Sequence, residues 1–393
     1  AQGQPTNIAM FDIAFWPSER GPYNYDTSPS AYSAGLSGTG LLNAPDSRWG
    51  GIMRQLQTTD FELANIEFIQ FWLMDPFNID ATTDLGVTGG DLYFNLGNVS
   101  EDILSDSRKS FENGLPISTN FDPNTLDTTV WGLVATTQPI VNAFENSSDP
   151  SIRLRQDIGL DGLNSQTEQA FFQSFYNWIG ANVTDFNART QIQNDPSNDD
   201  YNYYRDDRYD ASQLNILQRY KRYNGQEGNS PTNEFSQTLN SDGYPTSAST
   251  IPNVEDINQD NNLSEAESYF QYKISLRPQD MVIGQNFITD KLTKTVTLPD
   301  GSTKQITWYQ FKVPIRKYEK AVNGISDFRS IRFIRMFVKN AQNPLILRFA
   351  RLELIRGEWR TYIPSLLDPG EYIQGDPNST TFNLFAVNIE IGR

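Results

Sequence analysis

The chain has 393 residues, of which 37% are hydrophobic, 12% aromatic and 20% charged, a balance that favours β structure over charged helices. Its 31 basic and 48 acidic residues give a formal net charge of −17, which repels phosphate backbones, so we expect no nucleic-acid partner. Histidine and cysteine are both absent, which excludes disulfides, thiolate nucleophiles, His-assisted triads and His/Cys zinc sites.

Residues 1–145 alternate apolar segments with turns rich in Gly, Pro and Asn, the pattern of short β-strands. We expect strands at residues 7–16, 65–74 and 91–99.

No apolar run of the chain reaches the roughly 18 residues that a membrane-spanning helix requires. The segment is therefore predicted to be soluble, without direct membrane insertion.

Residues 146–262 are rich in Asp, Asn, Gln and Tyr and contain two helix-like stretches. In the first stretch, bulky residues recur at spacings of three and four, as on one face of a helix. The residues of this face are Phe172, Phe175, Tyr176 and Ile179. The second helix is expected to begin at Asp210, an N-cap residue type, and to end before Gly225.

Residues 263–393 again predict strand after strand. The expected strands are 268–276, 294–298, 305–313, 330–339, 345–355 and 382–391. A hairpin is expected between the second and third of these, because Pro299, Asp300 and Gly301 supply turn geometry between two alternating runs.

The two β regions resemble each other. NIEFIQFWL at residues 65–73 and SIRFIRMFV at residues 330–338 share one apolar pattern. The equivalent residues are Ile66 and Ile331, Phe68 and Phe333, and Ile69 and Ile334. Each segment follows an Asp-Phe pair, Asp60-Phe61 or Asp327-Phe328. The pattern indicates a duplicated sandwich.

We therefore predict a mainly β protein with two jelly-roll-like, galactose-binding-like β-sandwich domains at residues 1–145 and 263–393. Residues 146–262 would join them as an Asp/Asn-rich, partly helical connector. Two domains also suit the length, because a single core stops growing at roughly 250–300 residues.

The sharpest local motif is DINQDNNLSEAE at residues 256–267. Its oxygen-bearing residues, its apolar eighth residue and its final Glu follow the spacing of an EF-hand calcium loop. Asn261 stands where that loop has Gly, but Asn tolerates the left-handed backbone of the turn. The predicted Ca²⁺ ligands are Asp256, Asn258, Asp260, Asn262 and Glu267. The alternative is a solvated turn that caps the next element.

A weaker calcium candidate, DIGLDGLNSQTE, runs from Asp157 to Glu168. It has Gly159 where a ligand is needed, so we favour a turn there. In this interpretation Ser165 or Asn164 caps the following helix together with Glu168.

Without imidazole or thiol groups, catalysis would need a pair of carboxylates, as in glycoside hydrolases. The acidic cluster of the middle region consists of Asp199, Asp200, Asp206, Asp207 and Asp210. It lies in a loop-like run, where solvated charges are the rule, so we expect no enzyme and no catalytic residue.

A carbohydrate-binding cell-surface module is the alternative function. Trp49, Trp131 and Trp359 are each flanked by Gly or charged residues and could stack on sugar rings. Core packing is the commoner role of Trp, and the sequence leaves both open.

Several longer runs carry a resemblance to a known family. They are SERGPYNYD, WGGIMR, DFELANIEFIQFWLMDPF, GGDLYFNLGNVSEDIL, RKSFENGLP, QDIGLDGLN, LNILQRYKRYNGQEGNSP, INQDNNLSEAESYFQYKISLRP and VIGQNFITDKL. In these runs, which extend from about Ser18 to Arg356, the chain resembles the SprA (also called Sov) family. Members of this family form the outer-membrane translocon of type IX secretion and gliding motility in Bacteroidetes.

The resemblance implies that this chain is a soluble insertion of a very large membrane barrel that exports folded proteins. It implies as partners the rest of the barrel, other proteins of the secretion system and the secreted cargo. We expect the segment in the extracellular cap, in the bacterial cell envelope at the outer membrane, with a periplasmic position as the alternative.

Overall fold

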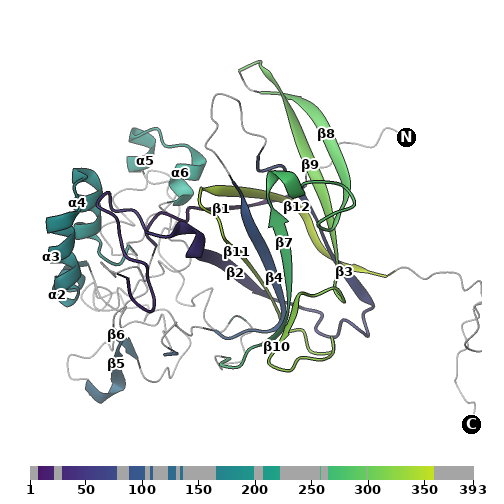
Figure 1. The fold of residues 1–393 in the computed structure, drawn as a ribbon, viewed down its shortest axis with the longest axis horizontal. Helices are drawn as coiled ribbons and strands as arrows, with labels where there is room; N and C mark the ends of the chain where they lie inside the picture. The colour runs from purple at the N-terminus through teal and green to yellow at the C-terminus, as the bar shows by residue number, and fades with distance from the viewer. Residues whose placement is uncertain are drawn as a thin grey trace, which may run out of the picture.

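The fold is a β-sandwich of two five-stranded antiparallel sheets, with short helices beside one end (Figure 1). The mainly β class and the sandwich architecture predicted from the sequence are confirmed. The computed structural model describes residues 8–21, 29–77, 88–101, 107–108, 123–129, 133–135, 165–198, 207–221, 257, 264–298 and 300–357.

The first sheet has the order β1 (Met10–Phe15), β12 (Leu345–Arg356), β3 (Ile66–Met74), β9 (Thr303–Pro314) and β8 (Ile288–Thr297). The second has the order β10 (Lys320–Val322), β7 (Ser268–Leu276), β4 (Gly90–Asn98), β11 (Phe333–Lys339) and β2 (Trp49–Gln55). A separate hairpin pairs β5 (Leu126–Thr128) with β6 (Leu133–Ala135). The α-helices of the described residues are α2 (Ser165–Phe171), α3 (Gln173–Asn182), α4 (Phe186–Asn194), α5 (Asp207–Ala211) and α6 (Ile216–Lys221).

Both sheets combine strands from the two β regions. In the first sheet β3 lies between β12 and β9, and in the second β4 lies between β7 and β11. The structure therefore corrects the predicted number of sandwiches, because the described strands of residues 1–145 and 263–393 form one sandwich together. The helices between them belong to an insertion into this sandwich. Apolar alternation had indicated the faces of each strand, but it carries no information about which strand is the neighbour.

The topology contains the duplication that the sequence pattern indicated. We call β1 to β4 the first unit, and β7, β9, β11 and β12 the second unit. The counterparts in the two units are β1 and β7, β2 and β9, β3 and β11, and β4 and β12. When each strand is replaced by its counterpart, the order β1-β12-β3-β9 becomes β7-β4-β11-β2, which is the order in the second sheet. The remaining strands, β8 and β10, are added outside β9 and β7. The two repeats thus interlock, and each sheet takes strands from both.

The core lies between the two sheets and is centred on aromatic rings. The ring of Phe71 on β3 lies 4.9 Å from that of Phe311 on β9 and 5.5 Å from that of Phe349 on β12. It also lies 5.7 Å from the ring of Phe94 on β4, in the facing sheet. These contacts bury apolar surface from both units in a single core.

The predicted first helix exists as two shorter helices, α2 and α3, joined at Phe172. Of its predicted apolar face, Phe172, Phe175 and Ile179 are buried. They form a second, smaller cluster with Leu36 and Leu42 from the segment between β1 and β2. The helical insertion is thus packed against the segment that connects β1 to β2.

The second predicted helix begins later than expected. Asp210 lies inside α5, and α6 starts at Ile216. The N-cap is Asn215, whose side-chain oxygen accepts the N–H of Gln218 at 3.0 Å while the Gln218 side chain accepts the N–H of Asn215 at 3.2 Å. This reciprocal pair satisfies two N–H groups at once, which a lone Asp cap does not.

The predicted hairpin between β8 and β9 is confirmed. Thr297 pairs with Thr303, and the N–H of Leu298 donates to the Ser302 carbonyl at 2.8 Å. Gly301 has a φ of +82°, which suits the left-handed backbone of this turn.

Candidate functional site

The outer face of the second sheet carries polar and aromatic side chains along β4, its central strand. Leu92, Phe94 and Leu96 point into the core, so the intervening Asp91, Tyr93 and Asn95 lie on the opposite face. We call Asp91, Tyr93 and Asn95, together with the neighbouring side chains on β7 and β11, the β4 ladder. Its members hold the second sheet together from outside the core.

A buried carboxylate, Asp91, lies at one end of the β4 ladder. It is 1% exposed, and it accepts hydrogen bonds from Arg277 and, at 2.7 Å, from Asn340, with the Lys273 ammonium 3.1 Å away. Burial alone would raise the pKa of Asp91, but Arg277, Asn340 and Lys273 outweigh it and hold the pKa below its usual range. Asp91 is therefore a charged structural centre with two basic neighbours.

The middle of the β4 ladder is aromatic. The Tyr93 ring stacks on that of Phe337 with centroids 4.7 Å apart, and the Lys273 ammonium lies 5.9 Å from the Tyr93 ring. Burial raises the pKa of the Tyr93 hydroxyl against the lowering effect of Lys273. This stack connects β4 to β11 across the outer face, where opposed side chains stabilise a sheet.

A second buried carboxylate, Glu101, lies three residues after the end of β4. Its two oxygens accept the backbone N–H groups of Ile257 at 2.8 Å and Ser264 at 3.0 Å, and it is 1% exposed. The backbone N–H of Glu101 also donates to the Ser264 carbonyl at 2.8 Å. Glu101 thus fixes the chain at two points as it returns from the helical insertion to β7, and we call these contacts the Glu101 anchor.

Glu267, three residues after the anchor, makes an ion pair with β11. Its Oε1 accepts from Arg335 at 2.8 Å and from the Ser100 hydroxyl at 2.9 Å. Burial would raise the pKa of Glu267, but Arg335 and Ser100 overcome that effect and lower the pKa. Arg332 adds a further link, since it donates to Asn98 at 2.9 Å and to the Ser264 hydroxyl at 3.0 Å.

The predicted calcium ligands fall mostly outside the described residues. These ligands are Asp256, Asn258, Asp260 and Asn262. Glu267 is the described member, and its carboxylate contacts Arg335 and Ser100. Among the described residues, no group of three carboxylates forms a cluster that could hold a metal ion. The calcium site stays a prediction.

The other candidate residues named from the sequence also fall into two groups, those outside the described residues and those within them. Trp131, Trp359, Asp157, Asn164, Asp199, Asp200 and Asp206 lie outside the described residues. Glu168 is buried in α2, and its Oε2 accepts the N–H of Ser197 at 3.2 Å. Asp210 pairs with Arg219 at 2.5 Å, and Trp49 is 66% exposed.

Sequence reasoning missed Asp91 and Glu101. Neither belongs to a short motif, since the partners of Asp91 lie 182 residues or more further along the chain at Lys273, Arg277 and Asn340. The available signal was a charged residue at each end of a strongly apolar strand, where burial requires partners.

Comparison with known proteins supplies the family. Residues 174–392, more than half of the chain, match the SprA_N family model, described as motility related/secretion protein. The search among curated proteins finds no match. No helix among the described residues has the length and apolar character needed to cross a membrane. The match confirms the resemblance that the sequence motifs indicated, and it covers the second unit of the sandwich together with helices α3 to α6. The chain therefore belongs to the SprA_N family of motility-related and secretion proteins.

Proposed function

We propose that this chain is an extracellular, cap-like segment of the outer-membrane translocon for type IX secretion. It contributes a rigid wall beside the export path and contacts the barrel, its partner proteins and the secreted cargo. The observation that carries the proposal is the family match over residues 174–392, since its description joins motility and secretion. The interlocked sandwich supports it, because two repeats that share both sheets cannot separate without breaking the core.

The proposed role is structural and non-enzymatic. Asp91 is charged and held by two cations, and Glu101 accepts two backbone N–H groups, so both carboxylates are committed to holding the fold. Asp91 and Glu267 also have lowered pKa values, which does not suit either of them as a general acid.

The test uses the full-length translocon in a bacterium that carries this secretion system. Glu101→Gln should loosen the segment that leads from the helical insertion back to the sandwich. It should therefore reduce both the secretion of a type IX reporter and gliding. Leu63→Ala is the control, because Leu63 is 86% exposed and should leave both unchanged. Equal secretion by Glu101→Gln and the control, at matched protein levels, would refute a role in export.

The extracellular position has its own test. In a full-length background without other cysteines, Thr295→Cys places a thiol on the exposed strand β8. A membrane-impermeant maleimide should label it on intact cells, while Val338→Cys, buried in the core, should stay unlabelled. Labelling only after the outer membrane is opened would place the segment in the periplasm.

We propose further that Asp256, Asn258, Asp260, Asn262 and Glu267 bind Ca²⁺. The Glu101 anchor supports this proposal, since it holds Ile257 and Ser264, the second and ninth residues of the loop. Glu267 would then share its carboxylate between Ca²⁺ and Arg335.

Calcium binding can be measured by thermal unfolding with and without a chelator. A ligand at about 100 times its Kd stabilises the folded state by about 2.7 kcal/mol. Excess Ca²⁺ should therefore raise the Tm, and Asp260→Asn should abolish the increase. Asp300→Asn, in the exposed β8–β9 turn, should retain it. A Tm that does not respond to Ca²⁺ would exclude the site.

Glycan binding is a second candidate function because Trp49 is 66% exposed at the edge of the second sheet. An exposed indole beside two glycines offers a flat surface for a sugar ring. A glycan array read with the full chain and with Trp49→Ala decides it, since a bound glycan must lose affinity in the variant.

A further inference from the structure

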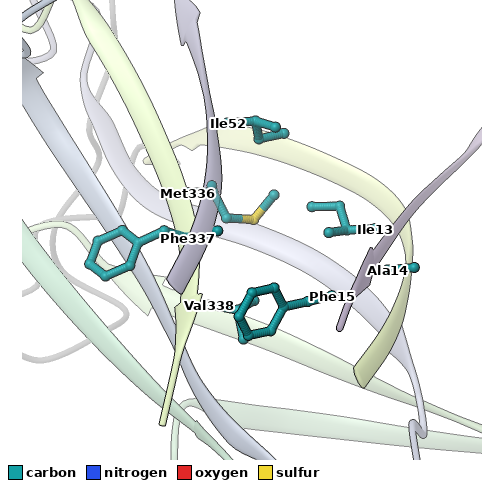
Figure 2. A pocket seen from close by; sticks show the side chains of 9 residues that line it. Ile13, Ala14, Phe15, Ile52, Met336, Phe337 and Val338 are labelled. Atoms are coloured by element: carbon teal, nitrogen blue, oxygen red, sulfur yellow. The ribbon is translucent and has the colours of Figure 1, made fainter. Parts of the chain in front are cut away.

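An apolar cavity of about 190 Å³ opens between β1 and β2 (Figure 2). Ile13 and Phe15 of β1, Ile52 of β2 and Met336 of β11 surround it, and we call it the β1/β2 groove. Both flanking strands are the last strands of their sheets among the described residues. The groove therefore lies at an edge of the sandwich, where an additional strand could insert a side chain.

The edge strands of the two sheets differ in how well they are protected against pairing with a further strand. β8 carries Lys291 and Lys294, and β10 has only three residues and begins with Lys320, features that discourage pairing with another strand. β2, in contrast, has the sequence WGGIMRQ, with Trp49 66% and Ile52 48% exposed. An apolar edge of this kind beside an apolar groove requires a cover.

The relation between the two units shows where a strand is missing. Met336 of β11 pairs with Ile52, and its counterpart Phe71 of β3 pairs with Phe311 of β9. β2 thus corresponds to β9, which is covered by the antiparallel strand β8. Exchanging the units places a counterpart of β8 antiparallel to β2, and no described strand lies there.

We propose that residues 382–391 of this chain occupy that position, pairing antiparallel with β2 and placing an apolar side chain in the β1/β2 groove. This segment, FNLFAVNIEI, lies outside the described residues. It has ten residues, as β8 does, and its alternation puts Phe385, Val387 and Ile389 on one face. That face matches the apolar lining of the groove.

The place where the described chain ends suits residues 382–391 as the segment that fills the groove. The N–H of Gly357, directly after β12, donates to the Asn65 carbonyl at 2.8 Å. Residues 56–65 connect the end of β2 to the start of β3, so the chain leaves at the end of the sandwich where β2 finishes. A segment that enters from there runs against β2, as β8 runs against β9. The intervening residues 358–381 can span up to roughly 80 Å, which is ample.

The test is a disulfide scan, which is simple to interpret because the chain has no cysteine of its own. Ile52→Cys is combined in turn with a single cysteine at each position from 383 to 390 in the full chain, followed by oxidation. Adjacent strands bring Cβ atoms within disulfide range only for side chains on the same face. We expect a disulfide within one chain to form at the one position of 385, 387 and 389 that lies opposite residue 52, several-fold more readily than at 384, 386 or 388. Thr293→Cys on exposed β8, scanned in the same way, should give none.

Other occupants give different products. A second copy of the chain in the groove would give disulfide-linked dimers, and a different protein would leave neither dimers nor internal disulfides. Cross-linking without alternation would mean an unpaired tail. Each of these three results overturns the proposal. Hydrogen exchange provides an independent measurement, since Val387→Asp should speed exchange of the β2 amides while Ala386→Asp, on the opposite face, should not.

Discussion

The backbone N–H of Phe61 donates to the carbonyl oxygen of Phe328 at 2.8 Å. These two residues belong to the equivalent Asp-Phe turns that precede β3 and β11. In each turn the Asp side chain, Asp60 or Asp327, accepts a nearby backbone N–H. The duplicated turns thus bind each other, and they bring the starts of β3 and β11 to the same end of the sandwich.

Phe61→Ala should destabilise the protein strongly. Phe61 is fully buried in the core, and truncation of a buried Phe costs about 3–5 kcal/mol. Urea unfolding followed by circular dichroism measures the loss. Leu63→Ala, two residues away and 86% exposed, should change the free energy of unfolding by less than about 0.5 kcal/mol. Equal effects of the two variants would show that the turn does not support the core.

Asp91→Asn should lower the free energy of unfolding by about 2 kcal/mol. Breaking a fully buried ion pair costs more, but Lys273 and Arg277 are 39% and 30% exposed and can be hydrated. Chemical unfolding at neutral pH measures the difference. Asp300→Asn is the matched control, because that carboxylate is exposed in the β8–β9 turn. A variant as stable as the wild type would contradict the assigned role.

The contribution of Asp91 should depend on pH in one direction. Its pKa is lowered in the folded state, so the unfolded state takes up the proton first as the pH falls. The stabilisation is complete above the unfolded pKa of about 3.9 and disappears as the pH falls through the lower folded pKa. The stability difference between wild type and Asp91→Asn should therefore shrink below about pH 4. A difference that grows with acidity would mean that the pKa is raised.

Glu101→Gln should release the chain between Ile257 and Ser264. The amide retains one acceptor oxygen and turns an NH₂ group toward a backbone N–H, which costs about 1–3 kcal/mol at a buried site. Hydrogen exchange of the Ile257 and Ser264 amides should accelerate, while the amides of β3 keep their protection. Unchanged exchange at both amides would show that the anchor does not hold this segment.

Tyr272→Phe tests the connection between the sheets. The Tyr272 hydroxyl donates to the Ile315 carbonyl at 2.5 Å, and burial raises its pKa well above the ordinary value. Removing the hydroxyl should cost about 1–2 kcal/mol, since the carbonyl loses a buried donor. In the wild type this contribution should persist up to about pH 10 and decline above it, as the unfolded state ionises first. Tyr318→Phe, 42% exposed, should have little effect.

Local pattern was sufficient for several elements because their determinants lie within a few residues. The alternation of β3 and the turn residues of the β8–β9 hairpin act over neighbouring positions, and both features were predicted correctly. The cap of α6 was missed because Asp210 and Asn215 are both good cap residues. The reciprocal bond with Gln218 decides between them.

By itself, the sequence determined that the chain is mainly β, that two strand-rich segments repeat a pattern and that the chain belongs to its family. Only the tertiary structure decided that the repeats interlock in one sandwich and that Asp91 and Glu101 hold distant segments. The physical reason is that side-chain alternation specifies which face of a strand is buried, whereas strand partners and buried ion pairs depend on contacts between residues far apart in the chain.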